Sequence, residues 1–197
     1  GLRLVGLMAW EAHCLGLPPF ERQSCCDEAV GRLVETANMC RDAGLPIDIV
    51  SCGGTGTFKF TAGIAGVTEI QAGGAILSDA TKRKRHVETD PAIFLRATIT
   101  SRPEPDRILH DAGFKALPVF YGDPEPLGLA NVAEIRTSAE HGIIALSAPS
   151  ATPAIGTGID FVIGYGDITI FMLDVRYGVR DGIVEAEWPI AGRGKLQ

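Results

Sequence analysis

A glycine-rich loop is the first segment of the chain whose residue types could do chemistry. It consists of Gly53, Gly54, Thr55, Gly56 and Thr57 and directly follows an apolar run. The backbone N–H groups and threonine hydroxyls of such a loop can converge on a phosphate. A tight turn without any ligand has the same composition, so both interpretations stay open. No Gly-Lys-Ser/Thr follows at the right spacing, which excludes a Walker A loop.

A second pair of glycines lies at the end of the next strand-like run. Gly73 and Gly74 close the segment that begins at Thr68, two residues after Gln71. Two successive parallel strands that each deliver glycines at their carboxyl ends are typical of a phosphate site in an α/β barrel. The second pair therefore favours the phosphate interpretation of the first loop.

The elements that position these loops are predicted from apolar patterning. Buried strands are expected at residues 2–9, 47–50 and 68–77, with a short helix at 61–66. Between the first two strands, capping-box spacing at residues 24–27 predicts a helix start, and Gly44 and Pro46 predict its end. Its apolar face comprises Ala29, Val30, Leu33, Val34, Ala37 and Cys40. This order predicts βα units with a parallel sheet.

The pattern changes near residue 90. From Phe94 onward the segments are short and rich in β-branched residues, and turn signals such as 122–124 and 180–182 separate them. The sequence therefore predicts a first domain at residues 1–90 and an antiparallel β-domain at residues 91–197. We place the boundary within residues 86–93.

Composition limits the partners and the compartment. The net charge of −6 argues against nucleic-acid or anionic membrane binding, because phosphate backbones need a basic face. We interpret the basic run 82–85 as a solvated turn. No apolar run is long enough to span a membrane. Five cysteines without C-x-x-C spacing favour buried thiols in a reducing cytoplasm over a disulfide framework.

Several separate motifs resemble one enzyme family. "SCGGTGTF", "GVTEIQAGGAILSDA", "RATITSRPEPDRILHDAGFKAL", "SAEHG" and "VRDGIVEAEWPIAGRGK" occur in the order found in the C-terminal half of the D-threonine aldolase/D-serine dehydratase family. The resemblance implies a pyridoxal-phosphate enzyme of alanine-racemase-like fold. It implies that the chain contains the last strands of a TIM-like α/β barrel followed by an antiparallel β-domain.

The resemblance assigns the two glycine segments to the phosphate of pyridoxal 5′-phosphate. Residues 53–57 would bind one side of it, and Gly73 and Gly74 the other. The family usually has Gly-Ser-Tyr where this chain has Gly73-Gly74-Ala75, so a hydroxyl donor is lost. Gln71 occupies the place from which such folds address the pyridine nitrogen, and a neutral amide there would leave that nitrogen largely unprotonated. The alternative is that Gln71 only caps the end of a strand.

The family's metal-dependent members carry His-x-Asp or His-x-Cys where this chain has Tyr165-Gly166-Asp167. Their divalent ion holds and polarises the β-hydroxyl of the substrate. One carboxylate without a nitrogen partner is a poor transition-metal site, so we expect no tightly bound metal. The alternative is Mg or Mn held weakly by Asp167. Tyr165 would act as a phenolic acid/base or bind the substrate.

The histidines and lysines are the remaining candidate catalytic residues. His141 in "SAEHG" resembles a family position, but a turn or packing role fits equally well, and His13, His86 and His110 receive no role. The resemblance places the Schiff-base lysine in a segment N-terminal to these residues. The chain opens without Met on a core strand, which suggests a partial or processed chain. None of its lysines matches the family motif: Lys59, Lys82, Lys84, Lys115 and Lys195.

We therefore expect the C-terminal portion of a lyase that cleaves or dehydrates D-amino acids with a β-hydroxyl, inactive on its own. Without a metal, racemisation or deamination of D-amino acids is the competing reaction. The alternative from another class is a non-catalytic fragment that pairs with a partner chain. The resemblance implies a homodimer, or association with an N-terminal barrel segment.

Overall fold

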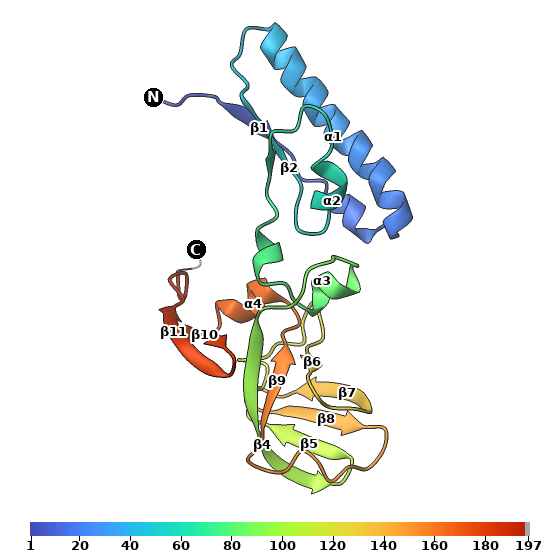
Figure 1. The fold of residues 1–197 in the computed structure, drawn as a ribbon, viewed down its shortest axis with the longest axis vertical. Helices are drawn as coiled ribbons and strands as arrows, with labels where there is room; N and C mark the ends of the chain where they lie inside the picture. The colour runs from blue at the N-terminus through green and yellow to red at the C-terminus, as the bar shows by residue number, and fades with distance from the viewer. Residues whose placement is uncertain (196–197) are drawn as a thin grey trace. The chain divides into compact units, whose positions relative to one another are not determined.

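The computed structural model describes residues 1–195 and divides them into two compact units (Figure 1). Unit 1 comprises Gly1–Ile76 and Lys82–Thr89, and unit 2 comprises Leu77–Thr81 and the chain from Asp90 onward. Within residues 1–195, none of the helices combines the length and the apolar character that crossing a membrane requires.

Unit 1 is built on a parallel sheet, as the sequence predicts. Its strands β1 (Gly6–Met8), β2 (Ile49–Cys52) and β3 (Glu69–Ile70) lie in the order β1-β2-β3. The predicted third strand, 68–77, is wrong beyond Ile70. The 3₁₀ helix η2 (Gly73–Ile76) follows instead, because two consecutive glycines weaken a strand and permit a tight turn.

Helix α1 (Pro19–Asp42) buries the predicted apolar face against the sheet. Val30, Leu33 and Ala37 belong to the same buried cluster as Val50 of β2. The predicted start at Ser24 is wrong, because the helix begins at Pro19. A proline at the first helical position has a preset φ and no N–H to satisfy.

Glycine residues lie at the end of α1 and just before the start of the next helix. Gly44 has a φ of +82°, and its N–H donates to the carbonyl of Arg41, which ends α1 as predicted. The short helix expected at residues 61–66 begins earlier, as α2 (Phe58–Thr61), directly after the glycine-rich loop.

The expectation that all five cysteines are thiols is wrong. Cys14, on the 3₁₀ helix η1 (Ala12–Gly16), forms a disulfide with Cys25 of α1. The sequence spacing of eleven residues gave no signal for this pairing, which arises because η1 folds back onto the first turns of α1. Cys26 and Cys52 are buried thiols, and Cys40 is partly exposed.

Unit 2 contains the predicted antiparallel β-structure. Six strands pair in the order β6-β9-β4-β5-β8-β7. Their bounds are β4 Phe94–Glu104, β5 Arg107–His110, β6 Glu125–Pro126, β7 Val132–Thr137, β8 Gly142–Leu146 and β9 Gly158–Val162. Ile99, Ile108, Ile144 and Phe161 form the centre of its core.

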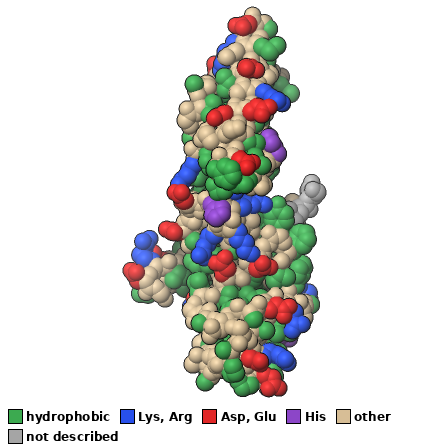
Figure 2. Space-filling model, turned by 90° about the vertical axis from the view of Figure 1, so that its right-hand side faces the viewer, with side chains coloured by type: hydrophobic (Ala, Val, Ile, Leu, Met, Phe, Trp, Pro, Cys, Tyr) green, Lys and Arg blue, Asp and Glu red, His purple; other side chains and the backbone are tan. Residues whose placement is uncertain are grey.

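A separate hairpin and two short helices complete the described chain. Strands β10 (Val175–Arg180) and β11 (Ile183–Pro189) join at Asp181 and Gly182, both with positive φ, as the turn signal predicts. Helix α3 (Ala80–Lys84) lies in the connection between the units, and α4 (Gly166–Ile170) follows β9. Hydrophobic side chains reach the surface in both units (Figure 2).

Candidate active site

The glycine-rich loop of unit 1 is a tight turn that leads from β2 into α2. Gly53 has a φ of +74°, a conformation that favours glycine. The carbonyl of Gly54 accepts N–H groups from Thr57 at 3.0 Å and from Phe58 at 2.9 Å. The backbone therefore reverses within four residues and begins a helical turn.

Part of this loop is held by a buried carboxylate that the sequence did not reveal. Glu11, only 2% exposed, accepts hydrogen bonds from the Gly53 N–H at 3.3 Å and from the hydroxyl of Thr57. The Gly54 N–H donates to Thr57 Oγ1 at 2.9 Å. The N–H groups of Gly53 and Gly54 and the hydroxyl of Thr57 thus form hydrogen bonds within the protein that hold the loop in shape. The sequence predicted that all three residues bind phosphate directly.

The Thr55 side chain of the loop lies beside the second glycine pair. Within residues 1–195, the backbone N–H groups of Thr55 and Gly56 make no hydrogen bond. A Cβ on Gly74 would lie 2.9 Å from Thr55 Oγ1, which is closer than such atoms normally approach. Gly74 therefore lets the two segments meet, as expected for loops at the carboxyl ends of neighbouring parallel strands.

Lys82 adds a positive charge at this place. Its Cε lies 3.3 Å and its Nζ 3.7 Å from the position that a Cβ on Gly74 would take. The sequence predicts a solvated turn at residues 82–85 and gives no indication that Lys82 lies beside Gly74. An ammonium group beside unpaired backbone N–H groups is a suitable environment for a phosphate.

Residues that follow β1 pack against the loop. Trp10 Nε1 lies 2.9 Å from the position of a Cβ on Gly54, and Leu15 Cδ2 lies closer still to the position of a Cβ on Gly56. Side chains at these two glycines would therefore displace Trp10 or Leu15. Because Gly54 and Gly56 have no side chains, Trp10 and Leu15 can pack against the loop and the loop backbone stays accessible.

Gln71 lies at the carboxyl end of β3. Its side-chain N–H donates to Ser51 Oγ at 2.6 Å, and the Ser51 hydroxyl donates to Glu69 at 2.7 Å. The side chain is exposed and neutral. This network orients the Gln71 amide across the ends of β2 and β3, on the side of the sheet where the glycine segments begin.

Tyr165 and Asp167 lie in unit 2, at the start of α4. The phenolic O–H of Tyr165 donates to Asp167 Oδ2 at 2.9 Å. Burial, followed by the hydrogen bond to the Asp167 carboxylate, raises the pKa of Tyr165 to about 12. Tyr165 is therefore a neutral hydrogen-bond donor at physiological pH.

The segment that carries Tyr165 is anchored by residues 79–81. The buried carboxylate of Asp79 accepts the Gly166 N–H at 2.9 Å, and the Thr81 hydroxyl donates to the Gly164 carbonyl at 2.7 Å. The ring of Tyr121 lies 5.0 Å from that of Tyr165. The sequence predicted β-structure through this segment, and α4 corrects that prediction, because Asp79 fixes the first turn of a helix.

The donor set around Asp167 does not fit a transition metal. Its Oδ2 is engaged by a neutral phenol, which is a poor ligand. Within the described chain, Asp167 belongs to no cluster of three histidine, cysteine or carboxylate ligands. We therefore derive no chemical step through a metal at this position.

The histidines are dispersed. His141 is exposed in the turn between β7 and β8, where its N–H contacts Ser138 Oγ at 3.3 Å, and a catalytic role for it stays a prediction. His110 is fully buried on β5, and His13 lies beside the disulfide on η1. Neither His110 nor His13 received a role from the sequence.

Comparisons with known proteins agree with these observations. Residues 92–179 match the family model described as "Putative serine dehydratase domain". The D-threonine aldolase of an Arthrobacter species is 31% identical over 88% of this chain and 47% of that protein. A 3-hydroxy-D-aspartate aldolase of Paracoccus denitrificans is 30% identical over 98% of this chain and 52% of that protein.

Solved structures decide the assignment. The crystal structure of D-threonine aldolase from Filomicrobium marinum superimposes with a TM-score of 0.92 at 31% identity, over 100% of this chain and 55% of that one. The chain is therefore similar, along its whole length, to members of the D-threonine aldolase and D-serine dehydratase family. It corresponds to the C-terminal half of the members and spans about half the length of the relatives it matches. D-threo-3-hydroxyaspartate dehydratase from Delftia shares the fold, with a TM-score of 0.83 at 24% identity.

Proposed function

We propose that the chain is the C-terminal portion of a pyridoxal-phosphate-dependent lyase that acts on D-amino acids carrying a β-hydroxyl. The observation that carries this proposal is the cluster of Thr55, Gly56, Gly74 and Lys82 in unit 1. Relatives named for D-threonine and 3-hydroxy-D-aspartate support the substrate class. The whole protein's reaction is either retro-aldol cleavage or dehydration.

Within the proposed site, this chain would bind the cofactor by its phosphate. The N–H groups of Thr55 and Gly56 and the Thr55 hydroxyl would donate to the phosphate oxygens, and the Lys82 ammonium would balance their charge. Gly53, Gly54 and Thr57 hold the loop in shape through Glu11. When bound, pyridoxal phosphate supplies an electron sink for bond breaking at the substrate's α-carbon.

Gln71 is proposed to address the pyridine ring with a neutral amide. Because Gln71 carries no negative charge, it would not stabilise a protonated ring nitrogen. Its N–H is directed to Ser51, which fixes the orientation of the amide. This arrangement would moderate the acidity of the substrate's α-carbon.

We propose that Tyr165 and Asp167 act on the substrate's side chain. The Tyr165 phenol would donate to the β-hydroxyl oxygen, and the Asp167 carboxylate would accept the hydroxyl proton. The absence of a nitrogen ligand beside Asp167 favours racemisation or deamination as the competing reaction, because the β-hydroxyl would not be polarised by a metal.

The second candidate function is a cofactor-binding chain that does no chemistry without a partner. The exposed apolar residues of β10 and β11 favour association, either with a second copy or with an N-terminal barrel segment. We further propose a cytoplasmic location.

Cofactor binding is tested by calorimetric titration of the 197-residue chain with pyridoxal phosphate. Thr55→Val and Lys82→Met should each weaken binding by about 5- to 50-fold, because each removes a donor to a charged phosphate. Lys84→Met on the same helix is the matched control and should leave the affinity unchanged. Equal affinities for all four proteins would contradict the proposed phosphate site.

Activity is tested separately on the full-length protein supplied with pyridoxal phosphate. Release of acetaldehyde from D-threonine, or of pyruvate from D-serine, without reaction of the L-isomers supports the lyase. Formation of the L-isomer supports racemisation instead. Cofactor binding with no turnover of any D-amino acid would support the second candidate function, a cofactor-binding chain without its own chemistry, and would contradict the proposed lyase.

A further inference from the structure

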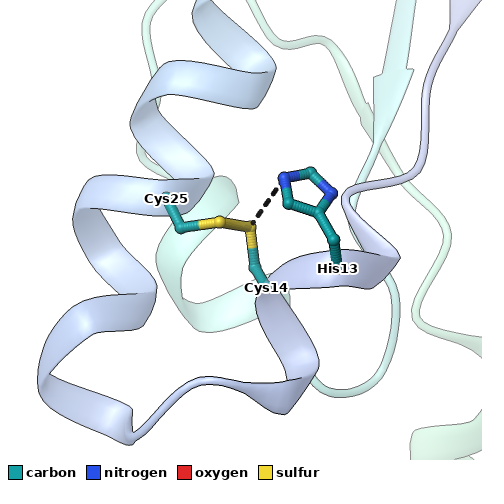
Figure 3. A group of neighbouring side chains, drawn as sticks. All are labelled: His13, Cys14 and Cys25. Atoms are coloured by element: carbon teal, nitrogen blue, oxygen red, sulfur yellow. Dashed lines mark hydrogen bonds between the residues drawn. A yellow bond between two sulfur atoms is a disulfide. The ribbon is translucent and has the colours of Figure 1, made fainter.

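A histidine and two cysteines converge outside the proposed cofactor site. His13 and Cys14 lie on η1, and Cys25 lies on the second turn of α1 (Figure 3). The ring nitrogen Nε2 of His13 lies 3.6 Å from Cys14 Sγ, and the three potential ligand atoms lie within 4.8 Å of one another. No step of the proposed lyase reaction uses these side chains.

We propose that reduction of the Cys14–Cys25 disulfide creates a Zn²⁺ site formed by His13, Cys14 and Cys25. Two thiolates and an imidazole are a preferred ligand set for Zn²⁺. The proposal rests on these three side chains alone and is independent of the proposed function.

The geometry already matches part of a tetrahedral site. Zn²⁺ lies about 2.3 Å from thiolate sulfur and about 2.0 Å from imidazole nitrogen, so tetrahedral angles place nitrogen about 3.6 Å from sulfur. The His13–Cys14 distance of 3.6 Å equals that edge. The two sulfurs, which are bonded to each other in the oxidised chain, need to separate to about 3.8 Å after reduction. Side-chain rotation can supply this change, because the two Cα atoms lie 5.8 Å apart.

The site is accessible from one side. A cavity of about 290 Å³ between the segment after β1 and α1 is lined by His13, Cys25 and Glu28 among others, whereas Cys14 is fully buried. Glu28 lies three residues after Cys25 and therefore on the same side of the helix. The cavity leaves the fourth coordination position to water or to the Glu28 carboxylate.

The accessible sulfur determines how the disulfide opens. A dithiol reductant attacks Cys25 Sγ from the cavity and expels Cys14 as the thiolate, next to the His13 ring. The second thiol of the reductant then resolves the mixed disulfide. Two electrons and two protons pass to the protein, and the reductant leaves as a disulfide. Binding of Zn²⁺ displaces the two thiol protons to solvent. In a reducing compartment the metal-binding form would prevail.

The test compares Zn²⁺ affinity of the oxidised and reduced chain by competition with a chromophoric chelator. The reduced chain should bind one equivalent of Zn²⁺ at least about 100-fold more tightly than the oxidised chain, because only thiolates coordinate. Binding of Co²⁺ should give a thiolate-to-metal charge-transfer band that the oxidised chain lacks. Free thiols should rise from three to five on reduction.

Variants identify the ligands. His13→Ala and Cys14→Ser should each weaken Zn²⁺ binding of the reduced chain by at least about tenfold. Cys40→Ser is the matched control, because Cys40 is a partly exposed thiol at the other end of α1. Equal Zn²⁺ affinity of oxidised and reduced chain, or no loss in His13→Ala, would overturn the proposal. His13 is exposed, so its removal should leave folding intact, as circular dichroism would verify.

Discussion

At the scale of single residues, burial of the His110 side chain changes its pKa, although the sequence assigned no role to this histidine. It is fully buried beside Phe161, with ring centroids 4.8 Å apart, and within residues 1–195 neither ring nitrogen has a hydrogen-bond partner. Burial lowers the pKa of His110 from 6.5 to about 4, with Asp111 raising it and His141 lowering it by smaller amounts. The ring is therefore neutral in the folded chain near pH 7.

His110 should make the chain less stable as the pH falls from 6.5 towards 4. In this window the unfolded chain binds a proton that the folded chain excludes, so the free energy of unfolding decreases by up to about 3 kcal/mol. Above pH 6.5 this contribution is fully present. Urea unfolding of His110→Leu over the same pH range should show a shallower dependence.

His13→Gln is the control for this comparison, because His13 is exposed and lies in unit 1, whereas His110 lies in unit 2. A His110→Leu variant with the same pH dependence as the parent chain would show that His110 does not titrate in this way.

Sequence reasoning located the glycines of the proposed phosphate site but misjudged individual donors. Gly53–Thr57 were recognisable because glycine and threonine after an apolar strand are an unusual local pattern. Glu11 was missed because a single acidic residue carries no local signal, and Lys82 was missed because a short basic run is usually a solvated turn. Only the contacts with Thr57 and Gly74 distinguish them from surface charges.

At the scale of elements, Arg22 holds the start of α1 to the chain around it. Arg22 as a whole is 4% exposed, and its guanidinium donates to the carbonyls of Leu17 at 2.9 Å, Leu15 at 3.3 Å and Arg85 at 2.6 Å. A buried arginine that satisfies three carbonyl groups fixes the position of η1, and η1 in turn packs against the glycine-rich loop through Leu15.

Arg22→Met should lower the free energy of unfolding by about 2–4 kcal/mol, because it leaves three partly buried carbonyl groups without the guanidinium donor. Arg32→Met, on the same helix, removes only an exposed ion pair with Glu28 and should cost less than about 0.5 kcal/mol. Urea denaturation of both variants measures the difference. Equal losses would mean that the carbonyl contacts of Arg22 contribute nothing specific.

Element types were predictable where periodicity was long. The apolar face of α1 follows from a pattern that repeats over many residues, and the parallel arrangement of β1 and β2 follows from the helix that connects them. Residues 166–170 were assigned to β-structure because Ile168, Thr169 and Ile170 favour strands locally. The helix α4 forms there because Asp79, 87 residues earlier, accepts the Gly166 N–H.

At the scale of the whole molecule, the β10–β11 hairpin exposes an apolar surface. Val179 is 62% and Val184 59% exposed, and the two residues are cross-strand partners. Tyr177, Ile183 and Trp188 on the same hairpin are also exposed. An isolated two-stranded sheet with so much apolar area is typical of a surface that a partner covers.

The chain should therefore associate in solution, and replacement of this pair should reduce association. Val179→Lys combined with Val184→Glu removes the apolar contact while opposite charges preserve the cross-strand pairing. Sedimentation at several concentrations should show a shift towards 20.9 kDa. The control exchanges the charges of Glu134 and Arg136, an exposed pair on β7. A parent chain that is monomeric at all concentrations would contradict the prediction.

By itself, the sequence determined the order of the elements, the change from a parallel to an antiparallel sheet, and the family. These properties follow from periodicity, turn residues and motifs within short windows. Only the tertiary structure decided that Glu11 holds Thr57, 46 residues away, and that Lys82 lies beside Gly74. It also decided that Cys14 and Cys25 join next to His13. Such contacts depend on how helices and loops pack, and packing is a property of the whole chain rather than of any local segment.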